Sequence, residues 1–176
     1  MVPPFASFSA QDGERYRSLA RRLAASVTVV TVLRRSDRVS PGAPRHDGFT
    51  ATAFLTVSID PPIVLVSATN ATRARAMLDD AAAFAVNVLA EAQQPLADRF
   101  ATPHDRRGDP FHDVPWVADA AGVPLLDGAL GAFSATPRAF VPAGDHTLCL
   151  GDVTGLHLGA DDAALVYRDR RYLRVE

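Results

Sequence analysis

The sequence contains no lysine, so all 18 basic residues are arginines. A phosphate group held by a cationic side chain must therefore be held by arginine, whose planar guanidinium can donate two parallel hydrogen bonds to one anion. The absence itself is explained more simply by overall composition, because alanine and arginine are both abundant. The absence of lysine restricts the cationic side chain of any anion site to arginine, but it does not indicate that such a site exists.

Cysteine occurs once, at Cys149, which excludes a disulfide within the chain and the small secreted scaffolds that depend on disulfides. The surrounding residues 147–150 form a largely apolar run that is typical of a strand. We therefore expect a buried structural thiol there rather than a nucleophile.

Long apolar runs are also missing. No stretch reaches the roughly 18 apolar residues that a membrane-spanning helix needs. A signal peptide has a basic region followed by an apolar core, and residues 1–5 do not show this pattern. We therefore expect a cytoplasmic protein without membrane contact. A net charge of −2 with 22% charged residues describes an ordinary globular protein and gives no indication of nucleic-acid binding.

The apolar content is sufficient for one core. The chain has 176 residues, 48% of them hydrophobic, which suits one domain and is short for two. We expect a flexible arm at residues 1–11 and a single domain at residues 12–176. Apolar and β-branched runs predict strands at residues 27–33, 48–57, 62–68, 84–89, 129–135, 146–157, 163–167 and 171–175. Helices are predicted at residues 12–25, 72–80 and from Pro95 onward.

Strands outnumber helices, and many of the connections are short. This pattern favours a mainly β protein with peripheral helices, of the α+β class, built as a closed or nearly closed antiparallel barrel. Residues 34–47 and 102–116 are expected to form long loops. Proline is poorly tolerated inside a sheet, so the strand around Pro137 is expected to lie at an edge, to be bulged or to be shortened.

The first candidate site is the segment Gly48-Phe49-Thr50-Ala51-Thr52-Ala53, followed by a second strand after Asp60-Pro61-Pro62. It has small and hydroxyl side chains where a strand usually has bulk. Small side chains let a planar ligand approach the backbone, and hydroxyls can bond to its polar edge. By itself, such a segment is more often a half-exposed threonine-rich strand than a ligand site.

The second candidate is the junction at residues 67–73, where a strand ends and a helix begins. Backbone amides at a helix N-terminus attract anions, and Thr72 and Arg73 can add a hydroxyl and a guanidinium. The structural alternative is an ordinary helix cap followed by a solvated arginine.

Two further polar residues invite a functional interpretation. Asn87 interrupts an apolar strand, and an interior amide with satisfied hydrogen bonds explains it best. His146 follows Asp145, which suggests acid–base or metal chemistry, but the other histidines show no ligand spacing and we predict no metal site.

Taken together, these segments resemble the short-chain flavin reductases, the reductase partners of two-component monooxygenases. The resemblance covers roughly residues 12–175, with several motifs in family order. It implies an antiparallel split β-barrel of the FMN-binding type. It also implies an NAD(P)H-dependent oxidoreductase that transfers hydride from NADH or NADPH to FMN or FAD. Such an enzyme works as a homodimer and supplies reduced flavin to a partner monooxygenase.

The resemblance also implies roles for individual residues. Flavin contacts are expected from Thr50, Ala51, Thr52 and Ala53. The phosphate end is expected at Ser67, Ala68, Thr69, Thr72 and Arg73. Arg99 and Phe100 are expected beside the flavin, and Tyr167 and Arg168 in the closing hairpin. His146 is expected to orient the nicotinamide, with no residue acting as an acid or base, because the cofactors supply the chemistry.

Departures from the family pattern leave alternatives open. Asp169 stands where the closing turn usually has glycine, and Ser26 where the first turn has one. A non-catalytic flavin carrier, or a flavin-dependent oxidase on the same barrel, remains an alternative function. The arginines of the first helix could dock another protein, although a solvated helix face explains them more simply.

Overall fold

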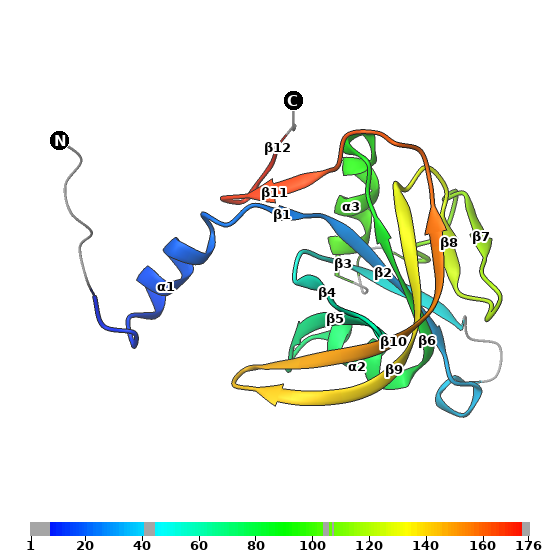
Figure 1. Ribbon diagram of the computed structural model, residues 1–176, viewed down its shortest axis with the longest axis horizontal. Coiled ribbons are helices and arrows are strands. Elements are labelled where there is room, and N and C mark those ends of the chain that lie inside the picture. The colour runs from blue at the N-terminus through cyan, green and yellow to red at the C-terminus, as the bar shows by residue number, and fades with distance from the viewer. Residues whose placement is uncertain (1–7, 41–44, 104–105, 107, 174–176) are drawn as a thin grey trace.

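The computed structural model describes residues 8–40, 45–103, 106 and 108–173. Most of the expected arm, residues 1–7, therefore lies outside the described residues. Antiparallel strands dominate the described chain, and the largest sheet has seven strands in the order β3-β2-β6-β9-β10-β5-β4 (Figure 1). The mainly β fold expected from the sequence is confirmed.

Most of the elements follow one another along the chain with short connections. The helices are α1 (Gly13–Ala20), α2 (Arg73–Asp80) and α3 (Gln94–Ala101), with 3₁₀ turns η1 (Ser36–Arg38) and η2 (Glu91–Gln93). The strands of the large sheet are β2 (Thr28–Arg34), β3 (His46–Ala51), β4 (Phe54–Ile59), β5 (Pro62–Thr69), β6 (Ala81–Val88), β9 (Gly131–Ala143) and β10 (His146–Leu158). The smaller sheets contain β1 (Ala25–Ser26), β11 (Val166–Arg168) and β12 (Arg171–Leu173), and β7 (Trp116–Ala118) and β8 (Pro124–Leu126).

The large sheet curls without closing through hydrogen bonds. Its two edge strands, β3 and β4, follow each other in sequence, yet β3 pairs with β2 and β4 pairs with β5. Thr52 and Ala53 link the two edges. The single strand expected at residues 48–57 is therefore wrong, whereas the expectation of a nearly closed antiparallel barrel is confirmed.

The main core fills the space inside the curl. Phe84 and Val30 lie there, and α2 contributes Met77 and Leu78. Gly151 lets β10 pass close to this core, because a Cβ at that position would lie only 2.5 Å from Cζ of Phe84. Cys149 is buried in the same cluster, as its apolar strand predicts.

Asn87 is an interior amide whose hydrogen bonds are satisfied. Its Nδ2 donates to the carbonyl of Val29 at 3.1 Å and to Oγ1 of Thr31 at 3.2 Å, and its Oδ1 accepts from the amide of Leu126 at 2.9 Å. Leu126 belongs to β8, so this side chain holds the β7–β8 hairpin against the large sheet. The hairpin itself was not predicted: a long loop was expected at residues 102–116, and no strand was expected at β7 or β8.

Strand β9 accommodates Pro137 by a bulge. Leu150 pairs with Ala139 and Gly151 pairs with Pro137, so the register skips Arg138. Strand β6 pairs with β9 only as far as Ala135, and Pro137 therefore lies where β9 has lost that neighbour. The expected bulge is confirmed, but β9 lies between β6 and β10 rather than at an edge of the sheet, and it is longer than expected rather than shortened.

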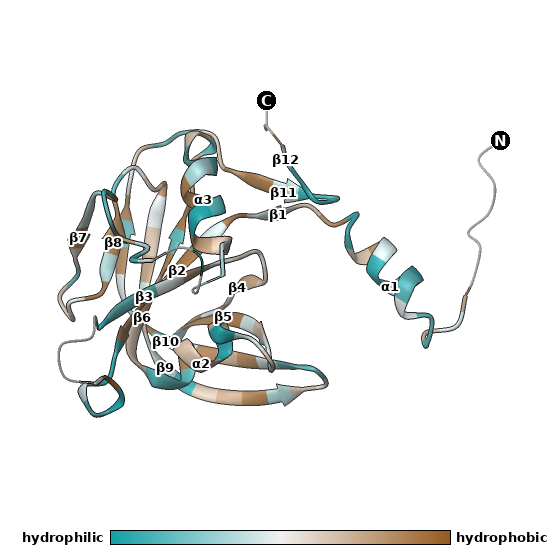
Figure 2. Cartoon of the chain, turned by 180° about the vertical axis from the view of Figure 1, so that it is seen from behind, coloured by the Kyte–Doolittle hydropathy of each residue, from teal (hydrophilic) through white to brown (hydrophobic). Residues whose placement is uncertain are grey.

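Helix α1 is shorter than expected and stands away from the sheets (Figures 1 and 2). None of its residues is buried. Tyr16, Leu19 and Leu23 are all exposed, so its apolar side contacts no core in a single copy of the chain. Among the described residues, no helix is long and apolar enough to cross a membrane.

Candidate functional site

The break between β3 and β4 forms the centre of the candidate site. Thr52 and Ala53 are exposed there, and both lie outside the strands. The break is fixed on both sides, since the hydroxyl of Thr50 donates to the carbonyl of Ala97 at 2.6 Å, and the amide of Ser67 donates to the carbonyl of Ala53 at 2.9 Å. A rigid, exposed stretch of backbone with small side chains is thus presented to solvent.

The junction of β5 and α2 lies beside this break through the Ser67–Ala53 bond. Thr72 caps α2: its Oγ1 accepts from the amide of Arg75 at 3.4 Å and donates to the carbonyl of Thr69 at 2.7 Å. The N-terminal amides of an eight-residue helix therefore point toward the same region as Arg73. This arrangement can bind an anion.

Arg73 is not simply solvated. Its Nη2 donates to Oδ2 of Asp47 at 3.0 Å, and the Asp47 side chain is only 6% exposed while that of Arg73 is 46% exposed. Oδ1 of Asp47 also accepts from the amide of Gly48 at 2.8 Å. The pairing ties α2 to β3. Asp47 was missed by sequence reasoning, because one acidic residue before a glycine gives no signal of burial.

His146 begins β10 and lies opposite Thr69, the last residue of β5. Its Nδ1 is 2.7 Å from Oδ1 of Asp145, and its Nε2 is 3.1 Å from Oγ1 of Thr69. The hydrogen bond and positive charge that His146 can offer lower the pKa of Asp145 from its ordinary value. Both ring nitrogens are therefore engaged, which suits an orienting role better than proton transfer.

These contacts join three of the predicted groups into one region. Residues 50–53, residues 67–73 and His146 are connected by direct hydrogen bonds between β3–β4, β5 and β10. Ala68 is buried in the main core, so only its backbone can contribute.

Helix α3 places its two predicted residues differently. Arg99 is exposed, and its Nη1 donates to the carbonyl of His112. Phe100 is 1% exposed and packs against Phe111, with ring centroids 5.3 Å apart. The Phe100 ring thus belongs to the core under α3 and leaves its face unavailable to a ligand.

Tyr167 and Arg168 lie on β11, in the small sheet. Tyr167 packs against Tyr172 with ring centroids 5.3 Å apart, and the Tyr172 hydroxyl donates to Oδ1 of Asp98 at 2.8 Å. Burial, aided by this bond to a carboxylate, raises the pKa of Tyr172 to about 12. Tyr167 and Arg168 therefore belong to a different sheet from the one that carries His146.

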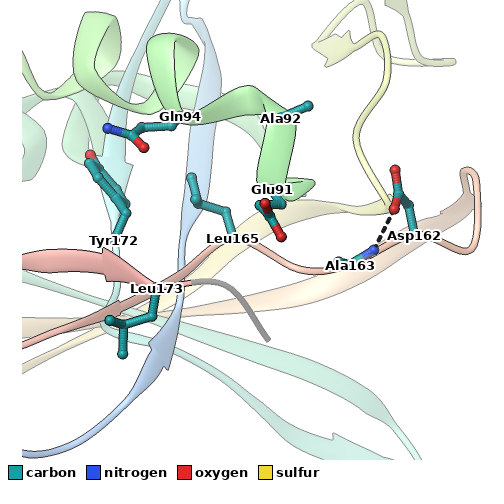
Figure 3. Close-up of a pocket in the computed structure, with 8 residues that line it drawn as sticks. All are labelled: Glu91, Ala92, Gln94, Asp162, Ala163, Leu165, Tyr172 and Leu173. Atoms are coloured by element: carbon teal, nitrogen blue, oxygen red, sulfur yellow. Dashed lines mark hydrogen bonds between the residues drawn. The ribbon is translucent and has the colours of Figure 1, made fainter. Parts of the chain in front are cut away.

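A cavity of about 420 Å³ lies elsewhere, between the start of α3 and β12 (Figure 3). Its lining residues are Glu91, Ala92, Gln94, Asp162, Ala163, Leu165, Tyr172 and Leu173. None of them belongs to the predicted site, where Thr52 and Ala53 are exposed to solvent.

This exposed surface fits a flavin nucleotide. The exposed backbone at Thr52 and Ala53 admits a planar ring, and the α2 N-terminus with Arg73 matches a phosphate. Both features lie within the region joined by the hydrogen bonds described above. The chain supplies arginine as the cation here, as a sequence without lysine requires.

Comparison with known proteins points the same way. The family model described as "Flavin reductase like domain" matches residues 20–176. The chain is 36% identical to an actinorhodin polyketide dimerase of Streptomyces coelicolor, over 93% of this chain and 86% of that protein. It is also 36% identical to an NADH:FMN oxidoreductase of Rhodococcus erythropolis, over 90% of this chain and 80% of that protein.

A further relative is the reductase subunit of a flavin-dependent monooxygenase of Rhodococcus jostii, at 29% identity over 94% of this chain and 79% of that protein. Among solved structures, an NADH:FAD oxidoreductase of Streptomyces globisporus superposes with a TM-score of 0.83 at 29% identity. That match covers 99% of both chains.

Proposed function

Because the chain belongs to the flavin reductase-like family, we propose that it is an NAD(P)H-dependent flavin reductase. It transfers hydride from NADH or NADPH to FMN or FAD, and it supplies the reduced flavin to a monooxygenase. The observation that carries the proposal is the match of the family model over almost the whole chain, together with the site at the β3–β4 break.

The flavin supplies the hydride-accepting chemistry when it is bound. The protein's part is to bind both nucleotides, to orient them and to exclude water. Thr52 and Ala53 present the backbone to the ring, while Arg73 and the α2 N-terminus bind the phosphate. His146 orients the nicotinamide, and Arg99 adds positive charge beside the site.

A diffusible flavin requires only moderate affinity. Arg73 already holds Asp47, so the phosphate meets a guanidinium whose charge is partly compensated. An open site of this kind releases its ligand readily. The same reasoning supports transfer of reduced flavin to a separate protein. The Rhodococcus jostii relative is named as the reductase subunit of a flavin-dependent monooxygenase.

The protein acts as a homodimer in this proposal. Strand β4 presents Leu55, Val57 and Ile59 to solvent, exposed by 62%, 51% and 94%. This apolar edge adjoins the open site, so a second copy packed there would bury it and help to enclose the flavin. A C2 arrangement would bring the same patch of each copy together.

The domain organisation and location expected from the sequence belong to the same proposal. We treat residues 12–176 as one domain and the cytoplasm as its location.

Steady-state oxidation of NADH and of NADPH, each with FMN and with FAD, tests the function. Turnover that requires added flavin is expected with at least one pair. Retained flavin without nicotinamide oxidation would favour a carrier or an oxidase instead.

A further inference from the structure

A single residue, Asn70, ties the tip of the β9–β10 hairpin to the end of β5. Its backbone amide donates to the carbonyl of Asp145 at 2.9 Å. Its Nδ2 donates to the carbonyl of Gly144 at 3.3 Å, and its Oδ1 accepts from the hydroxyl of Thr147 at 2.6 Å. Both polar atoms of the side chain are therefore bonded to the hairpin, on either side of His146.

Beyond the pairing of β10 with β5 and β9, which ends at His146, apolar packing contributes little to holding the tip. Residues 141–145 are all exposed, and residues 144–145 form a two-residue loop with Gly144 at a φ of 65°. Without apolar packing, a loop of this kind frays unless hydrogen bonds fix it. Asn70 supplies such bonds from outside the hairpin, to the carbonyls of both loop residues.

The His146 ring depends on that loop. An ionised Asp145 can only accept hydrogen bonds, so Nδ1 of His146 must donate to it. In the neutral ring, Nε2 then accepts from the hydroxyl of Thr69. Thr69 is itself fixed, because Thr72 donates to its carbonyl. One tautomer and one ring plane result, provided that Asp145 stays in place.

We infer that Asn70 is a positioning residue for His146: by holding the Gly144–Asp145 loop against β5, it fixes the tautomer and plane of the imidazole. The inference rests on the proposed function, in which His146 orients the nicotinamide. Asn70 lies within the junction at residues 67–73 but is not among the residues proposed to bind the flavin phosphate, and its side chain bonds to the hairpin that carries His146.

The test is Asn70→Ala, compared with Gln93→Ala as a matched control. Gln93 is also an amide that bridges two segments, since it accepts from the amide of Ala90 and donates to the carbonyl of Asp127, and it has no contact with His146. Histidine imidazole nitrogens are observed by ¹⁵N NMR in the free protein, with His146→Gln used to assign the signals. The KM values for NADH and for flavin are measured on the same samples.

In the native protein and in Gln93→Ala, His146 is expected as the Nδ1–H tautomer. Asn70→Ala is expected to show a mixture of tautomers and a roughly three- to tenfold higher KM for NADH, the size expected from losing one hydrogen bond. The KM for flavin is expected to remain unchanged. An unaltered tautomer in Asn70→Ala would overturn the inference, as would an equal rise in both KM values. If NADPH is the donor that the native protein oxidises, its KM is measured in place of that for NADH. If the native protein oxidises neither NADH nor NADPH, the proposed function fails, and the imidazole spectrum alone decides the role of Asn70.

Discussion

At the scale of single residues, Asp47 affects the proposed phosphate-binding part of the site, because it pairs with Arg73. A guanidinium has five N–H donors, and Asp47 takes one of those on Arg73 while its own side chain is almost fully buried. Removing Arg73 therefore has two effects: it deletes a phosphate ligand, and it leaves a buried carboxylate without this partner. From the sequence, only the first effect is visible.

The substitution Arg73→Ala is expected to weaken FMN binding by about 1.5–3 kcal/mol, the value of a charge-assisted hydrogen bond. Riboflavin, which lacks the phosphate, should bind as before. Calorimetric titration with both ligands measures the difference, and equal affinity of the native and substituted proteins for FMN would place Arg73 outside the site.

The same substitution is expected to lower the free energy of unfolding by about 1–3 kcal/mol, because a buried charged acceptor loses a donor. Asp47→Asn combined with Arg73→Ala should restore much of this stability in urea unfolding but none of the FMN affinity. Recovery of both together would mean that Arg73 acts only through the fold.

The loss of folding stability at acid pH offers a test of the Asp145–His146 bond. The pKa of Asp145 is lowered in the folded state from its ordinary value of 3.8, chiefly by the hydrogen bond to His146. A lowered carboxyl pKa stabilises the fold above 3.8, and this stabilisation is lost as the pH falls through the folded-state pKa. Urea unfolding of Asp145→Asn should show a shallower loss below this pH than the native protein. His146→Gln should likewise make the free energy of unfolding fall less steeply at low pH. If it falls as steeply in both variants as in the native protein, the Asp145–His146 bond is contradicted.

At the scale of elements, local pattern predicted most strands but not how they are shared between neighbours. Residues 48–57 alternate as one strand would, yet β3 and β4 pair with different strands because the sheet curls between them. The curl depends on the whole sheet and leaves no local signal. The β7–β8 hairpin was missed for another reason: each of its strands has three residues, and its anchor is the amide of Asn87 on a distant strand.

The closing hairpin shows where the departure from glycine matters. The two-residue loop between β11 and β12 has positive φ at both positions, 49° at Asp169 and 63° at Arg170. Such loops favour glycine, asparagine and aspartate. Asp169 suits its position, whereas Arg170 bears the steric cost of a left-handed conformation.

Arg170→Gly is therefore expected to raise the free energy of unfolding by about 0.5–1 kcal/mol, once the greater flexibility of glycine in the unfolded chain is included. Arg171→Gly, one residue later and inside β12, should lower it instead. Thermal and urea unfolding of the two variants measure the contrast. A loss of stability in Arg170→Gly would show that the Arg170 side chain contributes more than its backbone costs.

At the scale of the whole molecule, the parts of the candidate site that form contiguous segments are those that the sequence could propose. The roles of residues 50–53, residues 67–73 and His146 were predicted from the family resemblance, since local pattern alone favoured a threonine-rich strand and an ordinary helix cap. The fold brings these residues together. Phe100 shows the limit of this reasoning: it lies one helical turn after Leu96, and this spacing directs it toward the core that the sequence could not locate. Asp47 was invisible because its burial depends on the packing of α2 over β3.

The proposed dimer predicts that a charged side chain introduced on β4 weakens the association of the two copies. Ile59→Asp should shift sedimentation toward a single chain and lower flavin affinity together, because the open site loses its cover. Val117→Asp is the matched control, since Val117 is also exposed but lies on β7, away from β4 (Figure 1). A dimer that persists in Ile59→Asp would exclude the β4 face as the interface.

The most direct test of the central claim is anaerobic reduction of flavin that is present in large excess over the protein. With NADH or NADPH added in amounts equal to the flavin, the account predicts that all the flavin is bleached, because each reduced molecule leaves and the next one binds. Bleaching that stops at one flavin for each chain would indicate a retained cofactor, and no bleaching with either nucleotide would contradict the assignment as a flavin reductase.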